Sequence, residues 1–286
     1  MIQVQSLRQI KSRIRSIENT KKLTRAMEMV SVAKLKRSEL MLDGSLTYVS
    51  KVEALLKRIL LVSEIRANPF LKLREDKSRV ALCLVTSDTG LCSTYNQNII
   101  GAADKFIAQY GSNNVKLICV GRKGANYFKR KGLAITSIYA GYNGRYSDQL
   151  SQSILKELTG LFLSQEVGEV YFAYTSIQSA SRYRQIVEKF LPLECSQAKI
   201  QDCIFEPDAV GVLRELVPEY IANKMKMVLL SAFTSEHQSR AISMGISTNN
   251  AKELLVALVL LRNKIRQTNI TKEILEVISS AEALKG

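Results

Sequence analysis

Apolar residues recur at helical spacing along two long stretches, one at each end of the chain. The first stretch has the 3-4-3 spacing of a coiled-coil seam at Leu7, Ile10, Ile14 and Ile17. The apolar positions from 24 to 59 continue less regularly, which predicts a helix over residues 3–62 that does not supercoil uniformly. Asn68-Pro69 then ends the helical pattern.

The second helical stretch begins after Glu206-Pro207-Asp208, because proline suits the first turn of a helix. Two apolar stripes offset by one residue lie along it: Leu254, Leu258, Leu261 and Ile265, then Ile270, Ile274, Val277, Ala281 and Leu284. Such an offset is expected where a partner helix wraps right-handedly or ends partway along. About 75 helical residues extend on the order of 110 Å, far more than a domain of this size needs. This length indicates a rod, stalk or shaft.

The segment between the two stretches alternates short apolar runs with helical patterns. Such alternation predicts a parallel α/β sheet with helices on both faces. The predicted strands are 80–86, 115–120, 134–139 and 169–175, with 185–191 as an edge strand. The predicted helices between them are 95–109, 124–131 and 147–163.

The predicted fold class is α/β, with a long coiled coil added. The expected domains are an N-terminal coiled-coil helix (1–65), a central Rossmann-like parallel α/β domain (66–206) and a C-terminal coiled-coil helix (207–286). Two helices at opposite ends of a chain most simply pack on each other. Because the chain leaves the middle domain near the point where it entered, this pair is expected to run antiparallel.

The net charge of +15 is concentrated near the N-terminus: residues 1–60 carry +8, residues 61–207 carry +5 and residues 208–286 carry +2. A basic helix suits nucleic acid, anionic lipid or an acidic protein surface, and a solvated face without a partner fits the charge equally well. No run of about 18 apolar residues, the length needed to span a bilayer, occurs. Met1–Gln5 lack the apolar core of a signal peptide, so a protein of the cytosolic side is expected.

Residue types that carry catalysis or hold metals are sparse. The chain has a single histidine and no zinc-ligand spacing, so neither a metal nor a cofactor is expected. None of the five cysteines forms a CxxC pair, which favours buried reduced thiols over disulfides. They are Cys83, Cys92, Cys119, Cys195 and Cys203.

Three short motifs resemble sites but have simpler interpretations. Gly121–Gly124 (GRKG) lacks both phosphate-loop spacings, which favours a turn that starts a helix over a nucleotide site. Ser87–Gly90 (SDTG) follows a strand, and a surface turn with a capping aspartate is favoured over a catalytic site there. Ser235–His237 (SEH) lies in a helical stretch, where an exposed helix face is favoured over part of a catalytic triad.

Polar side chains cluster near the end of the second stretch. Residues 267–271 include glutamine, asparagine and two threonines, and asparagine and threonine are poor helix formers. A solvated face is the simplest interpretation, but this density of donors and acceptors favours contact with the polar surface of a partner.

The chain resembles the gamma subunit of the F-type ATP synthase from end to end. The resemblance rests on Ile10–Val30 (IKSRIRSIENTKKLTRAMEMV), Ser87–Cys92 (SDTGLC), Phe205–Pro207 (FEP), Ser235–His237 (SEH) and Asn263–Ile274 (NKIRQTNITKEI). Several motifs in the same order at both ends make chance similarity implausible.

The resemblance implies a central rotor without catalytic activity of its own. It implies a coiled coil inside a ring of alternating alpha and beta subunits, and an α/β domain near the membrane that meets the epsilon subunit and the c-subunit ring. By this resemblance, ion flow would turn the c ring and the shaft, and the shaft would drive the beta subunits through the states that make ATP. The implied location is the cytoplasmic face of the bacterial inner membrane, with peripheral attachment through the complex.

The resemblance also implies contacts that couple the rotor to the ring. Met27, Arg266, Gln267 and Thr271 match family positions at these contacts. Thr89 stands where the family usually has a basic residue, so a charged contact to a beta-subunit carboxylate is replaced by a weaker one. The chain also has Ser93-Thr94 where the family usually has two glycines.

Two other classes of function remain as alternatives. A basic coiled coil that binds nucleic acid fits the charge of the first helix, although the interleaved aromatic residues of a single-strand binder are missing. An α/β enzyme would need a cluster of titrating side chains that the sequence does not offer. The rotor, with no nucleic-acid partner, is the prediction carried forward.

Overall fold

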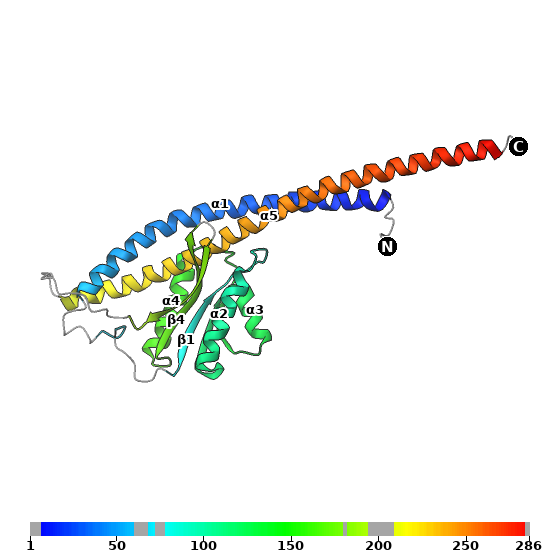
Figure 1. Cartoon of the computed structure of the whole chain (residues 1–286). Coiled ribbons are helices and arrows are strands. Elements are labelled where there is room, and N and C mark those ends of the chain that lie inside the picture. Colours follow the sequence, from blue (N-terminus) through cyan, green and yellow to red (C-terminus); the bar gives the residue numbers. More distant parts are fainter. Residues whose placement is uncertain (1–6, 60–67, 72–77, 180–181, 194–208, 284–286) are drawn as a thin grey trace. The chain divides into compact units, whose positions relative to one another are not determined.

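The computed structural model describes residues 7–59, 68–71, 78–179, 182–193 and 209–283 (Figure 1). By their internal contacts these form two compact units, one of residues 1–30 with 241–286 and one of residues 31–240. Two helices, α1 (Leu7–Ile59) and α5 (Ala209–Ala283), contribute residues to both units. The boundaries predicted near residues 65 and 206 lie outside the described residues, so the three-domain division stays a prediction.

The strands and helices of the middle segment form one sheet with crossover helices. The strands are β1 (Val80–Val85), β2 (Val115–Val120), β3 (Ile135–Tyr139), β4 (Glu169–Ser179) and β5 (Arg182–Leu191), in the order β3-β2-β1-β4-β5. The helices are α2 (Tyr95–Tyr110), α3 (Arg122–Arg130) and α4 (Asp148–Leu163), with a short 3-10 turn at Ser112–Asn114. The predicted elements are therefore present, with shifts of a few residues at their ends.

The predicted parallel sheet is confirmed for four of its five strands. β3, β2, β1 and β4 are parallel to one another, but β5 runs antiparallel to β4. Only residues 180–181 separate these two strands, and so short a connection can join antiparallel neighbours but not parallel ones. β5 is an edge strand, as the sequence predicted.

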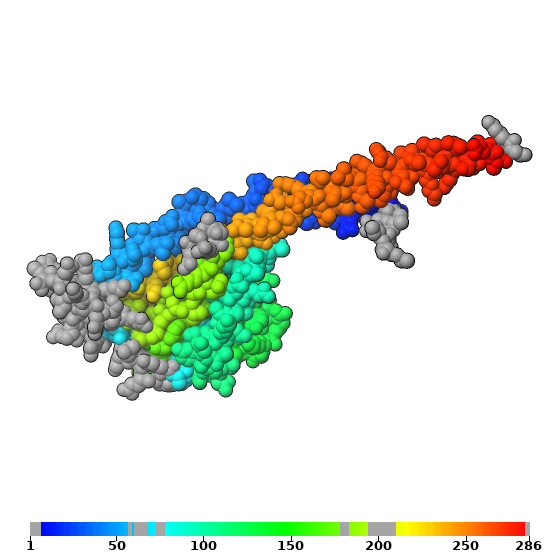
Figure 2. Space-filling view, viewed as in Figure 1, coloured from blue at the N-terminus to red at the C-terminus, as the bar shows by residue number. Residues whose placement is uncertain are grey.

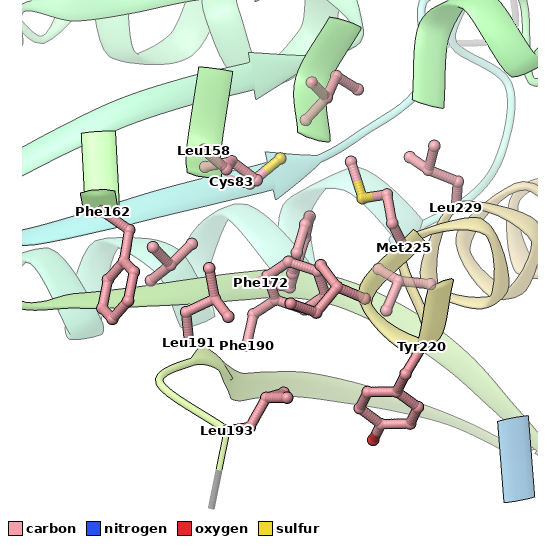
Figure 3. Packing of buried hydrophobic residues seen from close by; sticks show 14 of the residues in the cluster. Cys83, Leu158, Phe162, Phe172, Phe190, Leu191, Leu193, Tyr220, Met225 and Leu229 are labelled. Atoms are coloured by element: carbon pink, nitrogen blue, oxygen red, sulfur yellow. The ribbon is translucent and has the colours of Figure 1, made fainter. Parts of the chain in front are cut away.

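Each face of the sheet has its own apolar core. On one face, Leu82 and Leu84 of β1 pack against α2 and α3. On the other face, the alternate residues Cys83 and Val85 pack against α4, the start of α5 and the end of α1. Figure 3 shows side chains of this second core, where Phe172 and Phe190 of the sheet lie together and Met225 and Leu229 of α5 belong to the same cluster. Each fully buried side chain of this size stabilises the fold by about 1.5–3 kcal/mol.

The two long helices pair antiparallel within each unit. In the unit of residues 31–240, Tyr48 Oη donates a hydrogen bond of 2.5 Å to Glu219 Oε1. In the unit of residues 1–30 with 241–286, Ile10 and Ile14 form a core with Leu258. Low residue numbers of α1 thus meet high numbers of α5, as the two sequence seams predicted.

The inward face of α1 is more regular than its apolar residues suggested. Positions at seven-residue intervals are buried or half-buried all along the helix: Ile10, Ile17, Thr24, Ser31, Ser38, Ser45, Val52 and Ile59. Four of these are small hydroxyl residues, whereas Val30 and Leu55, counted in the predicted seam, are exposed. Polar residues thus occupy the central seam positions, where apolar residues alone give an irregular pattern. Non-uniform supercoiling of this helix stays a prediction.

Gly44 lies in the interior of α1, and a Cβ placed on it meets no other atom within 4 Å. Glycine in a helix costs about 0.5–1 kcal/mol relative to alanine, because it loses more backbone entropy on folding. We therefore expect Gly44→Ala to raise the free energy of unfolding by about that amount, measured by urea denaturation of the full chain.

The matched control is Gly121→Ala at the start of α3. Gly121 has a φ of +93°, and its Cβ would lie 2.1 Å from the Thr86 carbonyl oxygen, so this variant should be clearly destabilised. A loss of stability in Gly44→Ala would show that the centre of α1 is not a regular exposed helix.

Candidate functional site

The carboxyl ends of the parallel strands, where α/β sheets usually carry their sites, are closed by protein contacts. At the first turn of α3, the Arg122 N–H donates to Asp88 Oδ1 (3.1 Å) and the Lys123 N–H to the Ser87 carbonyl (3.1 Å). The Gly124 N–H donates to Thr86 Oγ1 (3.0 Å). These donors are the ones a phosphate would use, and all three are already engaged. The GRKG segment is a turn that starts a helix, as predicted.

Asp88 organises two of the strand-end loops. Besides capping α3, its second carboxylate oxygen, Oδ2, accepts hydrogen bonds from the N–H groups of Gly141 (3.0 Å) and Asn143 (2.8 Å). The prediction of a capping aspartate is confirmed, and the same side chain also joins the loop after β1 to the loop after β3.

The Ser235–His237 segment is not an exposed helix face, so that prediction was wrong. Ser235, Glu236 and His237 are all buried, because this turn of α5 lies against the ends of the strands. The Ser235 hydroxyl donates to the Thr175 carbonyl of β4 (2.9 Å). His237 Nε2 lies 2.8 Å from the Gly144 carbonyl, so Nε2 carries the proton and Nδ1 is the unprotonated nitrogen.

Position 144, opposite this turn, has room only for glycine. Its φ is +67°, and a Cβ there would lie 2.6 Å from His237 Cε1 and 3.2 Å from Glu236 Oε1. The loop after β3 therefore approaches α5 as closely as backbone can.

Arg240, one turn after Glu236, completes a buried polar cluster. Its Nη1 lies 2.9 Å from Glu236 Oε1, an ion pair in which both side chains are buried. Its Nε donates to the Gly90 carbonyl (3.2 Å), and its Nη2 to the carbonyl and hydroxyl oxygens of Thr89 (3.2 Å each). One guanidinium thus joins α5 to the loop after β1.

Burial sets the charges of this cluster. It raises the pKa of the Glu236 carboxyl to about 7, although Arg240 acts in the opposite direction. The ion pair with Arg240 and the more distant cation of Lys34 both favour the charged form of Glu236, but they do not offset its desolvation, so its pKa stays raised. Burial lowers the pKa of His237 to about 4, and the cations of Lys34, Arg240 and Arg145 act in the same direction. His237 is therefore neutral at pH 7.

The predicted coupling residues lie on exposed or half-buried surface. Thr89 is exposed in the loop after β1, within the unit of residues 31–240. In the other unit, Arg266, Gln267 and Thr271 are exposed on α5 and Met27 is half-buried on α1. The Thr271 hydroxyl donates to the main-chain carbonyl of Gln267 (3.0 Å), and the Gln267 side chain is exposed.

The end of α5 has no described segment over it (Figure 2). Every described residue from 266 to 283 is exposed. Large apolar side chains are among them, each between 47% and 68% exposed: Ile270, Ile274, Leu275, Val277 and Ile278. A shallow, open hollow on this helix is lined by Lys264, Gln267, Thr268, Thr271, Lys272 and Leu275. So much exposed apolar surface is typical of a segment that a partner covers.

Other candidate chemistry is limited in the described part of the chain. Cys83, Cys92 and Cys119 are buried free thiols, as predicted, while Cys195 and Cys203 lie outside the described residues. No group of three or more metal-ligating side chains occurs among the described residues. None of the helices in the described ranges is both long and apolar enough to cross a bilayer.

Comparison with known proteins decides the family. The ATP synthase family model matches residues 6–284. The ATP synthase gamma chain of Chloroherpeton thalassium is 34% identical over 299 residues, covering 98% of each chain. That of Heliobacterium modesticaldum is 35% identical over 289 residues, covering 97% of this chain and 99% of its own. The chain belongs to the ATP synthase gamma-chain family.

Solved structures share the fold of this gamma-chain family member. A chain of the Euglena gracilis mitochondrial ATP synthase superposes with a TM-score of 0.66 at 14% identity, covering 97% of this chain and 94% of its own. A chain of the central stalk and c ring of the Tetrahymena thermophila enzyme gives 0.62 at 20% identity, covering 78% of this chain and 98% of its own. The long helices and the mostly parallel sheet are thus a known arrangement.

Sequence reasoning missed the Glu236–Arg240 pair of this gamma chain. The only signal for it was an acidic and a basic residue four positions apart, which on most helices marks an exposed pair. What buries the pair is the approach of two strand-end loops, and that contact between distant segments leaves no local pattern.

The two buried titrating groups predict opposite pH dependences. Between pH 4.5 and about 7, folded Glu236 keeps a proton that the unfolded chain has released, so its contribution to the free energy of unfolding falls as pH rises. Between pH 6.5 and about 4, unfolded His237 binds a proton that the folded chain lacks, so its contribution falls as pH falls.

We therefore expect Glu236→Gln to gain stability relative to wild type as pH rises from 4.5 to 7. His237→Asn should gain relative to wild type as pH falls from 6.5 to 4. Urea denaturation at half-unit pH steps measures both differences. Profiles parallel to that of wild type would contradict the burial of these groups.

Proposed function

We propose that the chain is the central rotary shaft of an F-type ATP synthase, coupling ion flow through the membrane sector to ATP synthesis or hydrolysis. Membership of the gamma-chain family over nearly the whole length carries this proposal. The gamma chain is a non-catalytic subunit, and catalysis takes place in the beta subunits.

The partners we propose are the alpha and beta subunits of the catalytic ring, the epsilon subunit and the c-subunit ring. The solved relatives support this set, because their printed descriptions name a central stalk with a c ring, and F1 with a c ring. We place the chain on the cytoplasmic face of a bacterial inner membrane, attached through the complex. A nucleic-acid partner is not part of the proposal.

The physical role of such a shaft is to shift, by mechanical force, the populations of the conformations of the catalytic subunits around it. A helix pair that turns inside a ring presents a different face to each catalytic subunit in turn, and each face favours one conformation of that subunit. The exposed end of α5, residues 266–283, supplies surface for such contacts, and its exposed apolar side chains would be desolvated inside a ring.

Within this role, we propose Met27, Thr89, Arg266, Gln267 and Thr271 as the contacts that couple the shaft to the ring. The exposure of Arg266, Gln267 and Thr271 supports this assignment, since none of the three side chains is used to hold the fold. A guanidinium and an amide can donate hydrogen bonds to a polar loop, and such contacts give specificity more than raw affinity.

Replacing Arg266 and Gln267 by alanine should therefore separate coupling from folding. The melting temperature of the purified chain should stay nearly unchanged, because exposed substitutions alter stability by about 0.5 kcal/mol or less. Loss of a charged contact with the ring should cost about 2–5 kcal/mol of interaction, so ATP-driven proton pumping by the reconstituted complex should fall sharply.

The control is the double variant Lys252→Ala with Glu253→Ala, an exposed pair on the same helix to which no coupling role is assigned. Its pumping should match wild type. Normal pumping in the Arg266/Gln267 variant, at normal subunit stoichiometry, would remove these residues from the coupling contact.

Thr89 offers the ring one neutral hydroxyl, which already accepts a hydrogen bond from Arg240. Charge-assisted hydrogen bonds are about twice as strong as neutral ones. Thr89→Arg is therefore expected to change the ATPase rate or the pumping of the assembled enzyme. If both stay at the wild-type level, position 89 does not touch the ring in this enzyme.

A further inference from the structure

The loop after β1 holds a conformation that its own residues disfavour. Leu91 has a φ of +62° and Ser93 a φ of +51°, so two non-glycine residues within three positions adopt the left-handed region. Side chains with a Cβ rarely adopt it, and a bulky leucine least of all. Such backbone persists only where surrounding contacts determine it.

Four of those contacts come from one turn of α5. Two more are local: the Ser87 hydroxyl donates to the Thr89 carbonyl (2.6 Å) and the Tyr95 N–H to the Cys92 carbonyl (3.2 Å). Arg240 donates to the carbonyls of Thr89 and Gly90 and to the Thr89 hydroxyl. Its neighbour Ser239 donates through its hydroxyl to the Cys92 carbonyl (2.8 Å). Three of the four carbonyls between positions 89 and 92 thus accept hydrogen bonds from two consecutive side chains of a helix more than a hundred residues away in sequence.

Arg240 is itself held in place rather than free to reorient. Its side chain is 8% exposed, Glu236 Oε1 lies 2.9 Å from Nη1, and His237 Nδ1 lies 3.5 Å from the same nitrogen. The planar guanidinium can then direct its remaining N–H groups only at the loop. The buried Glu236 carboxylate therefore aims Arg240, and Arg240 determines the backbone of the loop.

We propose that Arg240 is a positioning residue that holds the Thr89–Ser93 loop in its strained shape and thereby sets the surface this loop presents to the ring. This inference rests on the proposed rotor function. Arg240 acts through the loop and touches no partner itself. Glu236 serves it as an orienting group.

Cys92 gives a direct readout of the loop, because its thiol is buried and lies within the strained segment. In a Cys195→Ser, Cys203→Ser background, alkylation of Cys92 by a maleimide at fixed pH measures opening of the loop. Alkylation of Cys83 and Cys119, buried in β1 and β2, reports unfolding of the sheet instead. One chain thus carries both the local and the global probe.

Arg240→Ala should raise the alkylation rate of Cys92 at least about tenfold, as expected for the loss of charged hydrogen bonds, and leave Cys83 and Cys119 slow. Protons pumped per ATP hydrolysed by the reconstituted complex should fall as well. Arg240→Lys should resemble alanine, because a point charge cannot hold two carbonyls in one plane. Arg130→Ala, an exposed arginine of α3, is the matched control and should change neither quantity.

Relief of the strain should rescue the defect. Glycine adopts a positive φ without cost, so Ser93→Gly in the Arg240→Ala background should slow Cys92 alkylation and restore part of the pumping ratio. A role of Arg240 in folding alone would not respond to this change. If Arg240→Ala fails to fold because Glu236 is left as an unpaired buried charge, the Arg240→Ala, Glu236→Gln pair removes that charge and repeats the test.

Slow Cys92 alkylation in Arg240→Ala, or a loosened loop with unchanged pumping, would overturn the inference. So would a failure of Ser93→Gly to restore anything. Failure of the rotor proposal is distinguishable, because then the wild-type chain itself would not assemble into a pumping complex while the alkylation results would still stand.

Discussion

The pairing of α1 with α5 is the constraint on which the rest of the structure depends. Neither helix can bury an apolar stripe alone. The stability of helices of 53 and 75 residues comes from tertiary packing rather than from the intrinsic helix propensity of their residues. Each becomes stable by covering the other. In one unit the contact is made by Ile10, Ile14 and Leu258. In the other unit the end of α1 and the start of α5 share an apolar core with the sheet. Beyond the last contacts of this pair, α5 continues as a fully exposed helix to residue 283, which is the part that requires a partner.

The α/β sheet is fastened to this helix pair in two different ways. Apolar packing of α5 on one face of the sheet supplies most of the stabilisation. The buried cluster of Glu236, His237 and Arg240 adds little net stability, because taking charges out of water costs about as much as the ion pair returns. Its contribution is directional: it fixes which loop lies against which turn of the helix. A purely apolar contact at this place would let the loop slide along the helix, whereas hydrogen bonds to the loop carbonyls prevent such sliding.

Much of the fold could be predicted from the sequence, because its elements have strong local signals. The strands were recognisable as apolar runs bounded by turns, and the antiparallel helix pair as two seams at opposite ends of the chain. The prediction failed where the decisive contact is not local. Ser31, Ser38 and Ser45 continue the seam of α1 as buried hydroxyls, and a search for apolar residues cannot find them. Ser235–His237 appeared polar and therefore exposed, but Gly144 and the loop after β1 bury it.

Direct observation of rotation tests the central claim most sharply. A cysteine placed at Lys129, exposed on α3, can carry a fluorescent rod on this chain in a complex whose alpha and beta subunits are fixed to a surface. On addition of ATP, the account predicts that the rod turns in one direction through full revolutions while the ring hydrolyses ATP. A rod that stays still, or only fluctuates, during sustained hydrolysis by the same complexes would contradict it.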